Sequence, residues 1–149
     1  MSYPLNDLTA ERDRRQEHVA QLCVKCFGPE SLHYKERVTR LFEEVVELAQ
    51  AEKLPHELLI KIIGYVYARP TGDFVQEAGG VGVCLLAYCA SRKMSADICE
   101  RNEIARVEHH LEQDPEHFMR RQAAKVASGV TTHEPSRART VPRFDAPEH

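Results

Sequence analysis

Apolar residues recur every three or four positions along most of this chain, and that spacing constrains the fold more than any other feature of the sequence. It is the period of an α-helix with one buried face, whereas a half-buried β-strand alternates at every second residue. No segment shows sustained strand alternation bounded by turn residues. The sequence therefore predicts an all-α protein.

Turn and capping residues divide this periodic sequence into helices. Gly28 and Pro29 end the first helix, Pro55 opens the third, and the turn before Phe74 caps the fourth. The predicted helices cover about residues 9–27, 33–52, 55–69, 74–93, 95–111 and 114–126. We therefore expect a bundle of five to six helices in a single domain, residues 1–127, because single hydrophobic cores are common in domains of roughly 100–150 residues.

The end of the sequence differs from the rest in composition. From Ser128 onward, prolines are spaced through Ser, Thr, Arg and Glu, with few large apolar residues. Such a segment buries too little apolar surface to offset its ordering entropy. We therefore expect residues 128–149 to form a disordered C-terminal tail.

The charge balance and the absence of a long apolar run limit the kinds of partner. Lys and Arg total 20 against 23 Asp and Glu, so a net charge of -3 provides no basic field for nucleic acid or an anionic membrane. The longest charge-free stretch before the tail, residues 78–91, is shorter than the roughly 18 residues typical of a membrane span. The first residues contain no apolar segment typical of a secretory signal. We expect a soluble, cytoplasmic protein that binds neither nucleic acid nor membranes.

The cysteines do not suggest a disulfide framework or a zinc site. Their number, 5, is odd, and reduced, buried thiols are the expected state. Cys23 and Cys26 have the spacing of half a zinc site, but there is no second such pair and both fall on the apolar face of the first helix.

The acidic segment RLFEEVVELAQAE, residues 40–52, is the first candidate for chemistry. Glu44 and Glu47 are three residues apart, so a helix projects both to one side, where their oxygens can hold a hard divalent cation. Glu43 lies beside them. These positions also fall opposite the apolar face of the helix, where an ordinary solvated surface is expected. The pattern by itself leaves both interpretations open.

The predicted fourth helix carries a second signal. It opens with Glu77 and continues in small and apolar residues, so we expect it to be buried on several sides and its carboxylate to need a partner. Gly79, Gly80 and Gly82 each cost up to about 1 kcal/mol of helix propensity relative to alanine, which favours a close approach to the backbone. A neighbouring helix, a nucleotide or a metal-bound water would explain them, and close helix packing alone is the alternative.

Taken in order, these segments resemble a known family. EEVVE at 43–47 followed by Glu77 resembles the EExxE and ExxD signature of the MazG-like all-α nucleoside triphosphate pyrophosphohydrolases. YARPTGDFVQEAGGVGVCLLAYC, NEIARV and RQAAK more specifically resemble the small phage-type branch, over about residues 31–126. The resemblance implies a MazG-like helical bundle that assembles as a homodimer or homotetramer, in the host cytoplasm if the protein is viral.

The resemblance also implies an activity and a site. The activity is hydrolysis of an NTP or dNTP to its monophosphate and pyrophosphate, with Mg2+ as the cofactor and Mn2+ as a substitute. The phage-type branch is similar to enzymes that act on dGTP, which makes dGTP a candidate substrate. The implied catalytic metal ligands are Glu44, Glu47 and Glu77, with Glu43 beside them as a further ligand or a neighbour of the ligands.

The sequence departs from the family signature at its fourth acidic position, where Gly80 replaces the usual Asp. The missing ligand would be water or a residue from elsewhere, and Glu103 in NEIARV is the candidate. An ion pair between Glu103 and Arg106 is the alternative. The missing Asp at Gly80 is also compatible with two other kinds of protein: a non-catalytic nucleotide-binding or regulatory homologue, and a purely structural helical module. The resemblance also implies three cations that hold the outer phosphates: Arg106, Arg121 and Lys125. Each of them is also consistent with an ordinary surface cation.

Overall fold

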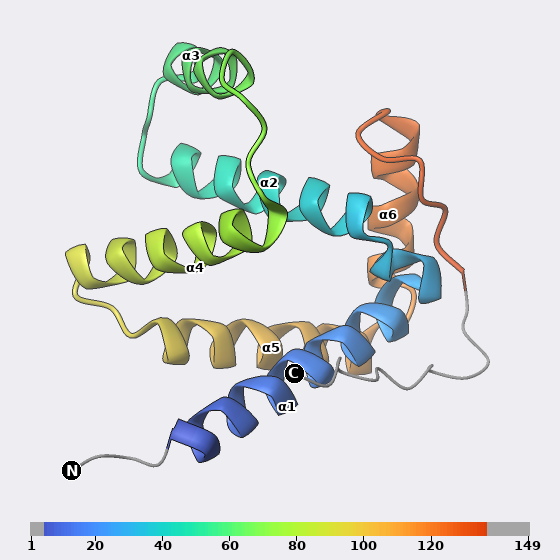
Figure 1. The fold of residues 1–149 in the computed structure, drawn as a ribbon. Helices are drawn as coiled ribbons and strands as arrows, with labels where there is room; N and C mark the ends of the chain where they lie inside the picture. The colour runs from blue at the N-terminus through green and yellow to red at the C-terminus, as the bar shows by residue number, and fades with distance from the viewer. Residues whose placement is uncertain (1–4, 137–149) are drawn as a thin grey trace. The chain divides into compact units, whose positions relative to one another are not determined.

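The computed structural model describes residues 5–136, and all of its regular structure is helical (Figure 1). No strand occurs among these residues. The helices are α1 (Leu5–Phe27), α2 (Tyr34–Ala51), α3 (His56–Tyr67), α4 (Phe74–Ser91), α5 (Ala96–Gln113) and α6 (His117–Ala127), with a short 3-10 helix η1 (Pro29–Leu32) after α1. The prediction of an all-α protein is confirmed.

The helix boundaries follow the capping residues of the sequence. Asp73 caps α4, and its Oδ1 accepts hydrogen bonds from the backbone N–H groups of Val75 and Gln76, both at 3.1 Å. Pro55 stands in extended conformation directly before α3, where its missing N–H costs nothing. Only α1 differs clearly from the prediction. It begins before Thr9, because no residue between Leu5 and Thr9 breaks a helix.

The C-terminal ends of α2 and α4 have the same geometry, with a lysine at the left-handed position. Lys53 and Lys93 adopt left-handed backbone conformations, with φ of 60° and 56°. The next residue closes the helix in each case, because the N–H of Leu54 donates to Ala49 O and the N–H of Met94 donates to Cys89 O, both at 2.9 Å. This is the Schellman pattern, which favours glycine at the left-handed position.

The helices belong to two compact units. Unit 1 comprises Met1–Arg40 and Ile104–His149, and unit 2 comprises Leu41–Glu103, so α2 and α5 each contribute to both. Unit 1 contains a small apolar core in which the rings of Phe27 and Phe118 pack edge to face, 5.7 Å apart. The other members of that core are Leu22, Cys26, Ile104, Val107 and Leu111.

Unit 1 also contains a buried polar cluster around Glu36, whose side chain is 3% exposed. Thr131 Oγ1 donates to one carboxylate oxygen at 2.5 Å, and Gln122 Nε2 donates to the other at 3.3 Å. Arg40 Nε lies 3.2 Å from the same carboxylate, and His133 Nδ1 lies 3.4 Å from it. These partners satisfy a charge that would otherwise be costly to bury.

The segment that follows α6 is therefore held against the rest of unit 1 as far as Ser136. The backbone N–H of Ser136 donates to Phe27 O at 3.2 Å, and the Ser136 hydroxyl donates to Glu30 at 2.9 Å. Residues 128–136 thus differ from the disordered tail expected from composition, because polar contacts hold a segment that has few apolar residues. The remainder of the predicted tail, 137–149, lies outside the described residues.

Unit 2 buries very little of its apolar surface. Cys89 is its one buried side chain among the described residues, and α4, which we expected to be covered on several sides, is exposed along most of its length. Among residues 5–136, α4 is also the one helix long and apolar enough to cross a membrane, a property that the core helices of soluble proteins share. The expected burial of α4 is not found within the described chain.

One polar contact in unit 2 joins the end of α2 to the end of α4. The hydroxyl of Tyr88 donates to Glu52 Oε1 at 2.6 Å, and Arg92 Nε lies 3.2 Å from the same oxygen. The hydrogen bond to the Glu52 carboxylate raises the pKa of Tyr88. This contact joins the two helix ends to each other through polar groups.

Candidate functional site

All five predicted metal ligands lie in unit 2, on three helices. On α2, Glu44 and Glu47 are exposed one helical turn apart, and Glu43 is half-buried beside them. Glu77 is exposed in the first turn of α4, and Glu103 is exposed on α5 at the edge of the unit. The helical placement of the acidic residues therefore agrees with the prediction made from their spacing.

The predicted phosphate-binding cations lie in unit 1. Arg106 is on α5, and Arg121 and Lys125 are on α6. Arg106 and Arg121 are exposed, whereas Lys125 is half-buried. The acidic and basic groups of the predicted site thus belong to different units.

The donor chemistry of the acidic residues suits Mg2+, since this cation prefers carboxylate oxygens and water. Among residues 5–136, however, no three His, Cys, Asp or Glu side chains are grouped so that they could hold a metal ion. The donor types fit the cofactor, but the described part of one chain does not bring three of them to one point.

Glu77 has a specific local environment at the start of α4. A Cβ atom on Gly72 would overlap Glu77 Oε1 and would lie 3.2 Å from its Cδ, so the Glu77 carboxylate rests in the space that Gly72 leaves. The backbone N–H of Glu77 donates to Asp73 O at 2.9 Å. The positive end of the helix dipole favours a carboxylate in this first turn.

The glycines later in α4 have no close neighbour. A Cβ atom at Gly79, Gly80 or Gly82 would find no described atom within 4 Å. The close approach that we expected at these residues is therefore not made by the described part of the chain. A Cβ atom at Gly80, where the resembling family has an Asp, would meet open space in the described part of the chain.

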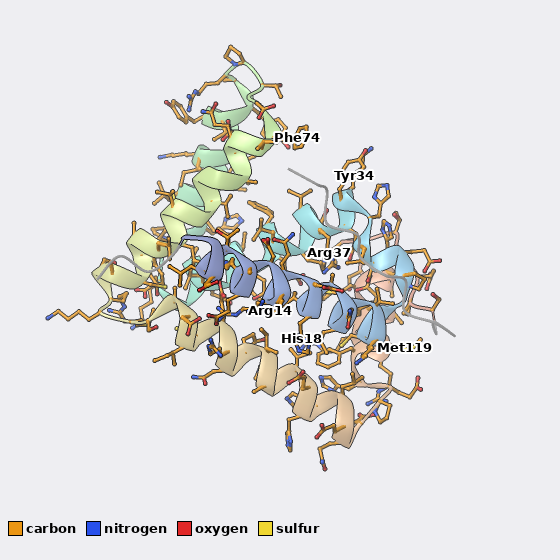
Figure 2. The ribbon with its side chains drawn as sticks, turned by 60° about the horizontal axis from the view of Figure 1, so that its bottom comes forward. Arg14, His18, Tyr34, Arg37, Phe74 and Met119 are labelled. Carbon is orange, nitrogen blue, oxygen red and sulfur yellow. The ribbon has the colours of Figure 1, made fainter. Side chains whose placement is uncertain are left out.

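Unit 1 contributes side chains of chemical interest outside the predicted site. His18 on α1 lies 2.8 Å from Glu108 on α5, and Arg37 donates to the Cys23 sulfur at 3.5 Å. Figure 2 labels His18 and Arg37. Burial raises the pKa of Cys23 even though the Arg37 guanidinium opposes this shift. The same cause raises the pKa of Cys26 to about 12, so both side chains are held as neutral thiols rather than as metal-binding thiolates.

The expectation of reduced thiols agrees with the structure, in which all five cysteines are free. The expectation that they are buried holds for Cys26 and Cys89 and is wrong for Cys84 and Cys99, which are exposed. Both exposed cysteines lie in unit 2, where the apolar faces of the helices are also uncovered.

Two interaction sets were not predicted from the sequence. Glu36 and Arg40 are four residues apart, a spacing that suggests a surface ion pair. This spacing carries no information about Thr131, which is distant in the sequence and binds Glu36 in the structure. The contact of Tyr88 with Glu52 likewise joins residues far apart in the sequence. A buried partner from a distant segment leaves no local spacing signal.

Comparison with protein-family models, with curated proteins and with solved structures finds no match. The MazG-like resemblance of the motifs therefore stays a prediction.

Proposed function

We propose that the protein is a magnesium-dependent nucleotide pyrophosphohydrolase, which converts an NTP or dNTP and water to the monophosphate and pyrophosphate. The observation that carries this proposal is the order of exposed carboxylates in unit 2. Glu44 and Glu47 lie one turn apart on α2, and Glu77 follows in the first turn of α4. This order is the one on which the MazG-like resemblance rests.

The residues of the chain have separate roles in this reaction. Glu44, Glu47 and Glu77 would hold Mg2+ or Mn2+ through hard oxygen donors, with Glu43 and Glu103 as further candidate ligands. When bound, the cation compensates phosphate charge and makes a water molecule more nucleophilic near neutral pH. The cations that would bind the outer phosphates through charge-assisted hydrogen bonds are Arg106, Arg121 and Lys125.

We also propose that the active form is a homodimer or homotetramer in which a second copy covers unit 2. Most of the exposed large apolar side chains of the described chain lie between residues 41 and 103. Soluble monomers rarely expose large apolar patches, and obligate interfaces bury roughly 2,000–5,000 Å². Carboxylates from two chains would also complete a ligand set that one chain does not gather.

A non-catalytic nucleotide-binding or regulatory homologue is the second candidate function. Gly80 favours it, because this residue supplies no carboxylate where the family has one, and no described atom approaches a Cβ atom built there. Such a protein would bind a nucleoside triphosphate without turnover.

The test is a panel of all canonical NTPs and dNTPs, incubated with the protein and Mg2+ and analysed by chromatography. We expect a nucleoside monophosphate and pyrophosphate from at least one substrate, dGTP being the first to try, and no product with EDTA. Release of a diphosphate and inorganic phosphate would contradict the proposed bond cleavage. No product, together with a rise in Tm on adding a non-hydrolysable triphosphate, would favour the second candidate.

A further inference from the structure

Gly72, in the loop before α4, does not owe its identity to backbone conformation. Among the described glycines, only Gly28 and Gly129 have a positive φ, so the backbone of Gly72 is one that other residues also adopt. A glycine at such a position makes the unfolded chain more flexible than alanine would, and this disfavours folding. The reason for glycine must therefore be the space that it leaves.

That space is filled by one side chain. The three atoms nearest to a Cβ atom built on Gly72 are Oε1, Cδ and Cγ of Glu77, the latter two at 3.2 and 3.5 Å. Gly64, Gly79 and Gly80 provide the contrast, because a Cβ atom there would have no described neighbour within 4 Å. Gly72 therefore makes room for the Glu77 carboxylate.

The residue that follows Gly72 is fixed to the first turn of α4, so one side of this space has a defined position. Asp73, the next residue, accepts from two backbone N–H groups of the first turn of α4, and its carbonyl accepts from the N–H of Glu77. A glutamate side chain has three rotatable bonds and many orientations in water, and a defined gap favours one of them.

We propose that Gly72 is a positioning residue, whose missing side chain admits the Glu77 carboxylate and keeps it in the orientation in which it serves as a Mg2+ ligand. This inference rests on the proposed function, since it assigns no separate activity to Gly72. Gly72 touches neither the metal nor the substrate and acts through Glu77. Because the displaced atoms are the end of a flexible side chain, Gly72→Ala moves the carboxylate and leaves the fold intact.

The first measurement needs no metal. In protein labelled with carbon-13 at glutamate side chains, the Glu77 carboxyl resonance is expected to shift in Gly72→Ala and to stay in place in Gly64→Ala. Gly64→Ala is the matched control because it adds the same atom to a glycine with no described neighbour within 4 Å. An unchanged Glu77 resonance in Gly72→Ala would overturn the contact on which the inference depends.

The second measurement is binding of Mn2+ alone, by calorimetric titration. Since loss of a group that orients a metal ligand typically costs roughly 10–100-fold in metal affinity, we expect Gly72→Ala to weaken Mn2+ binding about tenfold or more and Gly64→Ala to leave it unchanged. In a Glu77→Ala background, Gly72→Ala should weaken binding no further, because the carboxylate on which it acts is absent.

The outcomes separate this inference from the proposed function. If the wild-type chain binds Mn2+ and Gly72→Ala binds it equally well, Gly72 has no positioning role although the metal site stands. If Gly72→Ala weakens binding equally with and without the Glu77 carboxylate, its effect does not pass through Glu77. If the wild-type chain does not bind Mn2+, both the proposed metal site and this role fail, while the Glu77 resonance still decides whether the contact exists.

Discussion

Glu36 shows how one charged side chain can be tolerated in a small helical core. It is the one charged residue buried among residues 5–136, and donors from α6 and from the segment after α6 reach its two oxygens. An unpaired charge in that position would be strongly destabilising. The contact therefore ties the segment around Thr131 to α2.

Replacing this carboxylate by its neutral amide is expected to weaken unit 1. Glu36→Gln retains the size of the side chain but removes the charge that faces Arg40 and His133. We expect the free energy of unfolding to fall by about 1–3 kcal/mol, measured by urea denaturation. The control is Glu57→Gln on exposed α3, expected to stay within about 0.5 kcal/mol. Equal effects of the two changes would show that Glu36 is not paired as described.

The buried thiol of Cys26 is expected to make stability fall at alkaline pH. Burial raises its pKa in the folded chain to about 12, from an ordinary value of 9.0. Between these two pH values the folded state retains a proton that the unfolded state loses. The contribution of the neutral Cys26 thiol to the free energy of unfolding is therefore complete below about pH 9 and is lost as the pH rises towards 12. The slope due to this group is at most about 1.4 kcal/mol per pH unit. The free energy of unfolding is measured by denaturation from pH 8 to 11 for the wild type and for Cys26→Ala. The difference between the two should decline as the pH rises, and a constant difference would contradict the raised pKa of Cys26.

The ends of α2 and α4 contain strain that a glycine would relieve. Lys53 and Lys93 are left-handed, and this conformation costs a residue with a Cβ atom roughly 1–2 kcal/mol. Lys53→Gly and Lys93→Gly are each expected to raise the free energy of unfolding by up to about 1 kcal/mol, because glycine also makes the unfolded chain more flexible. Thermal denaturation measures this change.

The control for these two substitutions lies inside a helix. Lys61→Gly, within α3, should lower stability by about 1 kcal/mol, because glycine is a poor helix former. A loss of stability in Lys53→Gly or Lys93→Gly would mean that the lysine side chain contributes more than its backbone strain costs.

The helices were predictable from the sequence because their signals are local. Apolar spacing, Pro55 before α3 and the Asp73 cap of α4 each depend on a few neighbouring residues. The place of residues 128–136 was not predictable in this way, because Thr131 and Ser136 bind groups on α2 and beside η1. Composition indicates how much apolar surface a segment can bury, but it does not indicate which distant polar group the segment binds.

The candidate site was predictable in part for the same reason. The spacing of Glu44 and Glu47 places both on one side of a helix, and the position of Glu77 follows from the cap of α4. Whether these carboxylates meet depends on contacts between helices or between chains, and no motif encodes that. The open space beside Gly80 likewise became visible only in three dimensions.

Across the whole chain, the two units differ in how they are stabilised. Unit 1 has an apolar core and a buried polar cluster, whereas unit 2 buries one side chain among the described residues. Folding requires burial of apolar surface to offset conformational entropy. We therefore regard unit 2 as a surface that a second copy of the chain completes.

This proposal predicts a change of assembly from a single charge on α4. Leu86 is 60% exposed in the described chain, so Leu86→Glu should leave the stability of a monomer nearly unchanged. If an interface covers Leu86, the same change should weaken association of the two copies roughly tenfold or more. Sedimentation equilibrium measures the assembly. The control is Leu8→Glu on α1 of unit 1, where a similarly exposed leucine is expected to leave the assembly unchanged. A monomeric wild-type protein would contradict the proposed covering of unit 2.

The proposed catalytic metal site is tested most directly by measuring magnesium-dependent pyrophosphate release. The variants are Glu47→Gln and Glu77→Gln, and the controls are the wild type and Glu57→Gln. The amide keeps the shape of each side chain and removes its anionic oxygen donor. Since metal ions contribute several kcal/mol to such reactions, we expect each site variant to retain less than about a tenth of the activity, with unchanged far-UV circular dichroism. Glu57→Gln should retain full activity. Activity at the wild-type level in both Glu47→Gln and Glu77→Gln would contradict the assignment of these carboxylates to a catalytic metal site.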